Sequence, residues 1–147
     1  MVIDLAHASP TTVRQVLELS SAPVVFSHTG VAATCDNHGR NLDDQTLRRL
    51  AANRGVAGIA LFSGATCGND LLSFFRSLEH AIAVAGINHV GLGSDFDGGV
   101  ATPIDAAAWV LVTDGLLARG YSRTDIYKIM GGNVLRLLRE TLPEQNG

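Results

Sequence analysis

Apolar runs alternate with helical patterns along this chain, and the alternation restricts its possible folds more than any other feature. The apolar runs lie at residues 1–7, 22–28, 56–62 and 89–96. They are almost continuously apolar, as is typical of parallel strands that helices cover. A helical pattern follows each run, which is the arrangement of consecutive βα units. The sequence therefore predicts a single α/β domain with parallel strands over residues 1–147.

The predicted helices have recognisable ends. The first helix has Ser9 as its N-cap and Pro10 at its first position, where proline is favoured. The next two are expected near 42–53, with Gly55 as a stop, and near 70–85, closed by Gly86. The remaining helices are expected near 104–118, 123–130 and 133–141, with Ser122 and Asn133 as N-caps.

Composition excludes several classes of partner. The net charge of -3 and the 17% of charged residues provide no basic surface for nucleic acid or an anionic membrane. No apolar stretch approaches the roughly 20 residues that span a bilayer, and the N-terminus lacks a basic segment followed by an apolar one. We expect a soluble protein whose compartment is open, with the cytoplasm slightly favoured.

Ionisable side chains end three of the four apolar runs. His7 ends the first, His28 the second and Asp95 the fourth, while the third ends without one. Reactive groups gather at the carboxyl ends of parallel strands, and a right-handed crossover places consecutive strands side by side. Two neutral imidazoles and a carboxylate at one rim suit zinc, and the carboxylate can move protons on a metal-bound water. The glycines at positions 91, 93, 98 and 99 would let backbone and substrate approach.

Each candidate also has a simpler interpretation. A single histidine at a strand end is more often a hydrogen-bonded structural residue, and residues 93–99 (GSDFDGG) could form a calcium-like or turn-forming loop. Arg40, after the second run, is either a surface ion-pair partner or a clamp for a substrate carboxylate. The other histidines are His38, either at the surface or facing substrate, and His80 and His89, both expected to be structural or solvated.

Five stretches in order resemble the C-terminal half of the membrane (renal-type) dipeptidase family of zinc metallopeptidases, especially its bacterial members. They are VIDLAHAS, APVVFSHTG, GRN, HVGLGSDFDG and GGNVLRLL. The resemblance covers nearly all 147 residues. It implies the C-terminal half of a (β/α)8 TIM barrel of the amidohydrolase type, with four βα units and extra C-terminal helices. It also implies a two-zinc site that hydrolyses dipeptides, often with a D-residue at the C-terminal position.

The resemblance assigns a role to each candidate. His7 and His28 match two ligands of one zinc, and Arg40 matches the arginine that holds the substrate carboxylate. Asp95 matches the aspartate that takes a proton from the attacking water and passes it to the leaving amine. The other zinc's ligands, the bridging glutamate and a substrate-contacting histidine belong to the family's N-terminal half and have no counterpart here. The chain would therefore supply ligands for one zinc.

The chain is too short for a closed barrel, because a barrel of this kind needs eight strands. It would be a fragment of a longer enzyme, one subunit of a split enzyme, or a half-barrel that dimerises. Exposed parallel edges invite pairing, so we expect self-association or a complementary N-terminal half as the partner. Two further hypotheses are a non-catalytic half-barrel remnant or interaction module, and an amidohydrolase acting on a different amide.

Two cysteines lie in the predicted rim loops. Cys35 follows the second apolar run and Cys67 follows the third. They are either free thiols in a reducing cytoplasm or a disulfide that joins the loops, which resembles what extracellular family members have.

Overall fold

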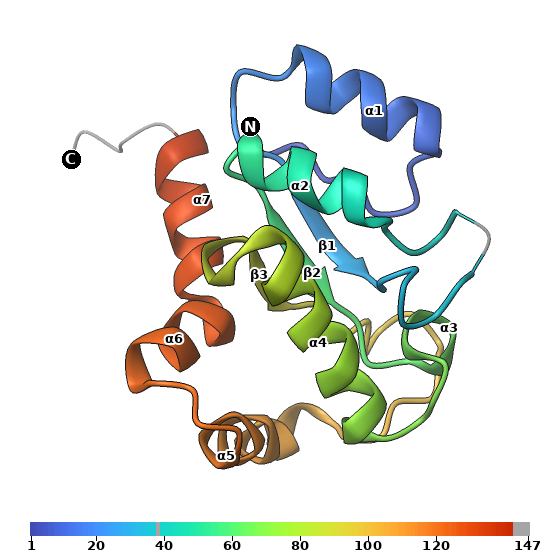
Figure 1. Ribbon diagram of the computed structural model, residues 1–147, viewed down its shortest axis with the longest axis vertical. Coiled ribbons are helices and arrows are strands. Elements are labelled where there is room, and N and C mark those ends of the chain that lie inside the picture. The colour runs from blue at the N-terminus through green and yellow to red at the C-terminus, as the bar shows by residue number, and fades with distance from the viewer. Residues whose placement is uncertain (38, 143–147) are drawn as a thin grey trace.

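The computed structural model describes residues 1–37 and 39–142, so His38 lies outside the described residues. Its centre is a three-stranded parallel sheet in the order β1-β2-β3. The strands are β1 (Val25–Thr29), β2 (Val56–Ile59) and β3 (Val90–Leu92). Helices α2 (Asp44–Ala52) and α4 (Leu71–Ala85) cross in front of the sheet (Figure 1). Parallel strands connected through helices confirm the predicted α/β class.

The first apolar run departs from the prediction, because residues 1–7 do not form a strand. Only an isolated parallel bridge joins Asp4 to Val25. The Leu5 N–H donates to the Val25 carbonyl at 2.8 Å, and the Val25 N–H donates to the Ile3 carbonyl at 2.9 Å. Within the described residues this segment pairs with β1 on one side only, so the ladder has no second neighbour to extend it.

The remaining helices follow the predicted order. They are α1 (Pro10–Leu19), α5 (Trp109–Ala118), α6 (Arg123–Tyr127) and α7 (Asn133–Thr141). Ser9 and Ser122 are N-caps as predicted, since their side chains accept the N–H groups of Thr12 and Asp125. Gly86 closes α4 with a positive φ of 86°, which also confirms its predicted role. Local side-chain chemistry thus determines most helix ends.

Several details of the helical regions differ from the prediction. A short helix, α3 (Ser63–Thr66), interrupts a segment predicted to be a loop. Gly55 does not stop α2, because Arg54 already leaves the helix with a φ of 65°. Single turns, η1 (Ile87–His89), η2 (Ala106–Ala108) and η3 (Lys128–Gly132), lie between the longer elements.

Asn133 is not an N-cap. It begins α7 directly after the π-turn η3, with helical backbone angles on both sides of the junction. Its buried side chain donates instead to the Ile87 carbonyl at 2.7 Å and the Val90 carbonyl at 2.8 Å. Asn133 therefore ties α7 to the start of β3.

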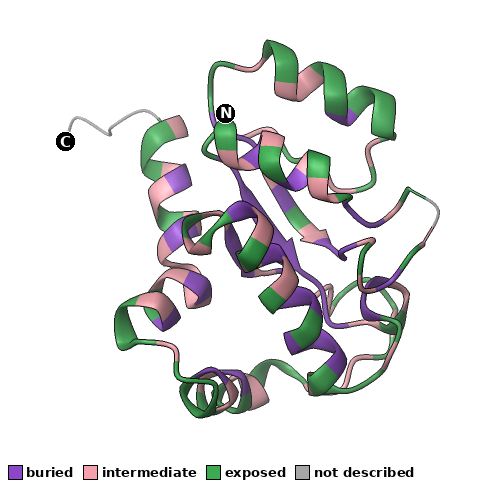
Figure 2. Cartoon of the chain, viewed as in Figure 1, coloured by how far each residue is buried: buried purple, intermediate pink, exposed green. Residues whose placement is uncertain are grey.

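The core lies between the sheet and the helices that cover it. Figure 2 shows the buried residues concentrated on the strands and on the inward faces of the helices. On β1, Phe26 is buried while its neighbour Ser27 is exposed on the other face. The largest fully buried side chains include Leu47, Leu50, Ile59, Phe74, Leu78 and Leu116. The helices therefore cover the face of β1 that carries Phe26, and the opposite face is exposed at Ser27 but buried at Thr29.

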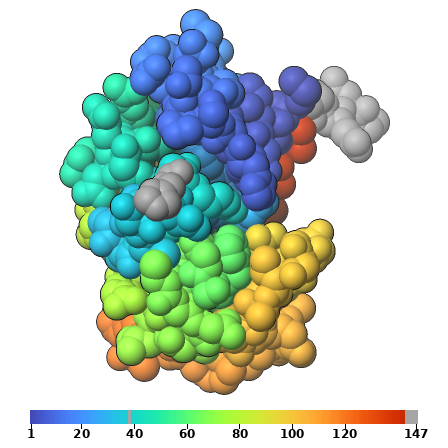
Figure 3. All heavy atoms as spheres, turned by 90° about the vertical axis from the view of Figure 1, so that its right-hand side faces the viewer, coloured from blue at the N-terminus to red at the C-terminus, as the bar shows by residue number. Residues whose placement is uncertain are grey.

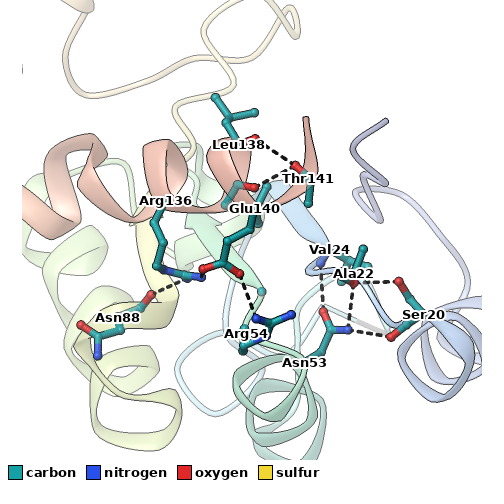
Figure 4. A network of polar contacts seen from close by, with 12 residues as sticks. Ser20, Ala22, Val24, Asn53, Arg54, Asn88, Arg136, Leu138, Glu140 and Thr141 are labelled. Atoms are coloured by element: carbon teal, nitrogen blue, oxygen red, sulfur yellow. Dashed lines mark hydrogen bonds and ion pairs between the residues drawn. The ribbon is translucent and has the colours of Figure 1, made fainter. Parts of the chain in front are cut away.

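A polar network lies where the strands begin (Figure 4). The Asn53 side chain donates to the carbonyls of Ser20 and Ala22 at 3.1 Å each and accepts the Val24 N–H at 2.9 Å. Glu140 pairs with Arg54 at 3.3 Å, and also with Arg136 at 3.2 Å. This end of a parallel α/β barrel serves stability, while chemistry occurs at the opposite end.

His80 and His89 are structural, as predicted. The His80 Nε2 lies 2.7 Å from the Asp44 carboxylate, and the His89 Nδ1 lies 2.9 Å from the Gly55 carbonyl. None of the helices within residues 1–37 and 39–142 has the length and apolar character needed to cross a lipid bilayer.

Candidate active site

The segments that follow the strands meet on one face of the molecule. Figure 3 shows residues 30–37 and 39–41 in cyan, 62–70 in green and 93–105 in yellow as neighbours on this face. Each segment begins at or just beyond the carboxyl end of a strand. Because the strands are parallel, these ends lie at the same edge of the sheet. This rim is where a parallel α/β fold places reactive groups.

His7 and His28 converge at this rim. Their Nε2 atoms are 2.8 Å apart, and their ring centroids are separated by 4.9 Å with an interplanar angle of 59°. The bridge between Asp4 and Val25 places the two histidine-bearing segments side by side. The expected proximity of the two imidazoles is confirmed.

Asp95 lies beside this pair. Its Oδ1 is 3.9 Å from the His28 Nε2, and the two side chains are 14% and 20% exposed, respectively. His7 and Asp95 both have a φ of 64°, in the left-handed region that non-glycine residues rarely adopt. Such strained backbone clusters at functional sites, where the surrounding structure holds it.

The glycines near Asp95 have different structural reasons. A Cβ on Gly93 would lie 2.3 Å from the Ser27 carbonyl oxygen, so the predicted close approach of backbone is confirmed there. At Gly98 a Cβ would lie 2.4 Å from an oxygen of the Asp95 carboxylate, and Gly99 has a φ of 69°. Gly91 has only ordinary contacts, the nearest at 3.5 Å, so the expected close approach of backbone is absent there.

Arg40 points into the rim. Its two terminal nitrogens donate to the His28 carbonyl at 3.2 and 3.3 Å, and its guanidinium lies 5.8 Å from the centroid of the Phe62 ring. Burial lowers the pKa of Arg40, and the negative charge of Asp95 opposes that shift. Arginine remains cationic at neutral pH despite such a change. The guanidinium therefore brings a positive charge close to both His28 and Asp95.

The loop that carries Arg40 is held to the neighbouring loop. A disulfide joins Cys35 to Cys67, with Cα atoms 5.2 Å apart, so the interpretation as free thiols was wrong. The buried Asn41 amide donates to the Cys35 carbonyl at 2.7 Å and to the Ala65 carbonyl at 3.1 Å. The sequence analysis missed this role of Asn41, although the GRN motif contains it.

Two hollows lie beside the histidine pair. A cavity of about 350 Å³ borders His7 and Arg40 and has an apolar wall that includes Val13 and Phe26. An open groove of about 420 Å³ runs past His28 to Asp95. A small substrate therefore has space next to all four predicted residues.

The two imidazoles fit zinc as part of a ligand set. Two histidine nitrogens on one tetrahedral zinc, each about 2.0–2.1 Å from it, lie about 3.3 Å apart. The observed 2.8 Å between His7 and His28 requires only a small separation of the rings. Within residues 1–37 and 39–142, no group of three or more His, Cys, Asp or Glu side chains is arranged to hold a metal. A complete site therefore needs at least one ligand from another source.

The sequence matches the membrane dipeptidase family, peptidase family M19, over residues 1–146. The chain belongs to this family. It is 35% identical over 146 residues to Dipeptidase 3 of Homo sapiens, covering 95% of this chain and 30% of the human protein. It is 37% identical over 147 residues to Dipeptidase tcpJ of Claviceps purpurea, covering 95% of this chain and 34% of that protein.

Solved family structures agree with this membership. A metallopeptidase from Rhodobacter sphaeroides, liganded with a phosphinate mimic of the dipeptide L-Ala-D-Ala, superposes with a TM-score of 0.87 at 28% identity, covering 95% of this chain and 42% of that one. A dipeptidase described as an M19 metallopeptidase gives a TM-score of 0.86 at 28% identity, covering 94% and 42%. These dipeptidases are TIM barrels, of which this chain represents a part.

Proposed function

We propose that this chain forms one side of a zinc-dependent dipeptidase site in which His7 and His28 bind one zinc ion. The observation that carries the proposal is the convergence of their Nε2 atoms, 2.8 Å apart, at the carboxyl ends of parallel segments. Bound zinc supplies Lewis acidity, which polarises a carbonyl and activates water. Membership of a metallopeptidase family supports zinc as the metal.

Asp95 serves as the proton carrier in this proposal. Its carboxylate lies 3.9 Å from the His28 Nε2 and borders the open groove. From there it can accept a proton from the attacking water and deliver it to the leaving amine, as general acid–base catalysis requires. The left-handed backbone at Asp95 directs this carboxylate, and Gly98 leaves room for it.

Arg40 binds the substrate's C-terminal carboxylate. A guanidinium presents two parallel N–H donors that match a carboxylate, and in this structure two nitrogens of Arg40 converge on one carbonyl oxygen. The substrate class is a small dipeptide with a free carboxylate. The L-Ala-D-Ala mimic bound to the Rhodobacter sphaeroides relative supports a D-residue at the C-terminal position.

The two-zinc site of the family needs a second polypeptide segment. That segment would supply the other metal's ligands, and it would pair along the open edge at residues 3–5. It is either another part of a longer protein or a separate chain, and self-association is the alternative. Light scattering distinguishes self-association from a monomer that needs a complementary half.

The experiment measures hydrolysis of L-Ala-D-Ala by the chain with zinc, alone and after addition of the N-terminal portion of the Rhodobacter sphaeroides relative. Activity is expected only with the added portion. In that complex Asp95→Asn should lower kcat by about 10²–10⁴-fold, the usual contribution of a general acid–base group, while zinc stays bound. The matched control is Asp114→Asn, an exposed carboxylate on α5 that lines neither hollow, which should leave kcat unchanged.

Arg40→Ala tests the substrate class. It should raise KM for L-Ala-D-Ala by about tenfold or more, because one charge-assisted pair with the carboxylate is lost. The amide of the same dipeptide lacks that carboxylate, so its KM should change little. Arg48→Ala is the control, since Arg48 lies on the exposed side of α2 and pairs with Asp44. Robust hydrolysis by the chain alone, or full activity of Asp95→Asn, would refute the proposed function.

A further inference from the structure

The cavity of about 350 Å³ that Arg40 borders has a wall of buried apolar side chains. Val13 comes from α1, Phe26 from β1 and Leu42 from the loop before α2, and Leu5 completes this wall. Apolar side chains that face an empty space lack contact atoms on that side. An apolar group that enters the cavity would therefore gain contacts with all four.

The loop that carries Arg40 approaches α1 at the edge of this cavity. Gly39 has a φ of 85°, and a Cβ at this position would lie 3.3 Å from the Cγ of Pro10, the first residue of α1. The Ala32 N–H donates to the Leu42 carbonyl at 2.9 Å, so the two ends of the loop are joined. The cavity is thus enclosed by fixed segments, as is usual for small-molecule sites.

The two hollows contact different parts of the proposed site. Arg40 lines the cavity, whereas His28 and Asp95 line the open groove. In a dipeptide, the C-terminal carboxylate and the side chain of the same residue are attached to one Cα. When Arg40 holds that carboxylate, this side chain therefore lies close to the cavity, and the groove remains for the amide bond.

We propose that this cavity is a specificity pocket for the side chain of the substrate's C-terminal residue, and that it selects medium-sized and large apolar residues. This inference rests on the proposed function, because Arg40 must hold the carboxylate. Small-molecule sites range from about 300 to 1,000 Å³, so a cavity of about 350 Å³ suits a single residue. A charged side chain would lose its hydration against the apolar wall, which disfavours it.

The ligand of the Rhodobacter sphaeroides relative has a much smaller group at this position. That ligand is a phosphinate mimic of L-Ala-D-Ala, whose C-terminal residue has only a methyl side chain. A methyl group leaves most of a cavity of about 350 Å³ unfilled. The pocket should therefore favour D-leucine over D-alanine at the C-terminal position.

The first experiment compares N-acetyl-D-leucine with N-acetylglycine as ligands of the metal-free chain. Each probe has one amide and one carboxylate, so only the side chain differs. In ¹H–¹³C methyl spectra, the leucine probe should shift the signals of Leu5, Val13 and Leu42 and bind about tenfold or more tightly than the glycine probe. Equal affinity for the two probes, or unchanged methyl signals at these three residues, would overturn the inference.

Variants that fill the cavity provide the second experiment. Ala32 lines the cavity and is partly buried, so Ala32→Leu should remove most of the preference for the leucine probe. The matched control is Ala33→Leu, the next residue, which is exposed and lines neither hollow. Thr46→Leu fills the cavity from α2 and should act like Ala32→Leu, so the test survives if one variant fails to fold in thermal unfolding. A full preference in both folded cavity variants would refute the pocket.

Failure of this inference can be distinguished from failure of the proposed function. Arg40→Ala should weaken both probes, and unchanged binding of the leucine probe would overturn the pocket, because the carboxylate would not be held by Arg40. If the chain with the added N-terminal portion hydrolyses no dipeptide while the leucine probe still binds in the cavity, the proposed function fails and the pocket stands. If that complex hydrolyses L-Ala-D-Ala and L-Ala-D-Leu with equal kcat/KM and the two probes bind equally, the pocket is refuted and the dipeptidase function stands.

Discussion

The disulfide between Cys35 and Cys67 should contribute several kcal/mol to the stability of this chain. It closes a segment with a sequence separation of 32 residues, which includes the loop of Arg40 and all of α2. Because Cys35 is buried and Cys67 is exposed, the least disruptive replacement is the double variant Cys35→Ala/Cys67→Ser. The alanine avoids burying an unpaired hydroxyl, and the serine keeps an exposed site polar.

The magnitude follows from the entropy of the unfolded chain. A cross-link removes about 2.1 + 1.5R ln n cal/mol/K from the unfolded state, where n is the number of residues in the closed loop. With the separation of 32 residues as n, this is about 12 cal/mol/K, or about 3.7 kcal/mol at 25 °C. Strain and residual structure reduce the value in practice, so we expect a loss of about 2–4 kcal/mol.

Urea unfolding followed by circular dichroism measures this difference. The double variant should have a lower free energy of unfolding, and its m-value should rise slightly because the unfolded chain becomes more expanded. A reducing agent should destabilise the unmodified chain by a similar amount and leave the double variant unchanged. A free energy of unfolding that changes by less than about 1 kcal/mol would refute the entropic argument.

Three further predictions concern single residues. Asn133→Ala should lower the free energy of unfolding by about 2–4 kcal/mol, because the partly buried Ile87 carbonyl and the buried Val90 carbonyl lose their donor. A urea titration measures this loss, and the exposed Asn69→Ala should have little effect. Gly93→Ala should cost about 1–3 kcal/mol, because its Cβ would overlap backbone oxygens of β1 and β2, and an unchanged melting temperature would contradict that geometry. Burial raises the pKa of Asp4, but hydrogen bonds to its carboxylate lower it further, so the net shift is downward. The lowered pKa contributes stability that is present above its ordinary value of 3.8 and is lost as pH falls through the lower folded pKa. Acid titration of Asp4→Asn should therefore show less loss of stability below pH 3.8 than the unmodified chain shows.

The sequence predicts most helices and three strands because their signals are local. Ser9 and Ser122 cap helices through hydrogen bonds that span three residues, so neighbouring residues contain all the information needed. The structure of the first apolar run is not determined by neighbouring residues alone. A strand exists only through its neighbours, and residues 1–7 have β1 on one side only within the described chain. Its composition favours a strand, but within residues 1–37 and 39–142 no second neighbour extends the pairing.

Asn133 shows how tertiary structure can override a local signal. An asparagine at a helix start is a good N-cap, but here the preceding turn continues helically and the side chain is free to bind elsewhere. The carbonyls of Ile87 and Val90 lie more than 40 residues away in sequence, at separations of 46 and 43, so no local pattern identifies them.

The candidate site also contains some features that the sequence predicts and others that only the structure shows. Strand order places His7 and His28 together, and this follows from the sequence once parallel strands are assumed. The hydrogen bond from the Ser27 N–H to the Asp4 carboxylate does not follow from it, because it depends on the bridge that joins two segments. Both residues lie in motifs quoted for the family resemblance, yet only the structure shows that they are in contact.

The one-sided pairing of residues 1–7 leads to a final prediction about coupling. A complementary segment that pairs along residues 3–5 would hold the segment that carries His7, and zinc would hold His7 to His28 from the other side. Both ligands therefore stabilise the same placement of His7, and linkage requires each to strengthen the other's binding by the same factor. A coupling of about 1–3 kcal/mol is typical, which corresponds to about 5–150-fold in affinity.

Titration calorimetry of the chain with the N-terminal portion of the Rhodobacter sphaeroides relative, with and without zinc, measures this factor. His7→Ala should abolish the coupling, whereas His89→Ala, at the opposite end of the strands, should preserve it. Equal affinities with and without zinc would show that the edge segment already holds His7 in its final position.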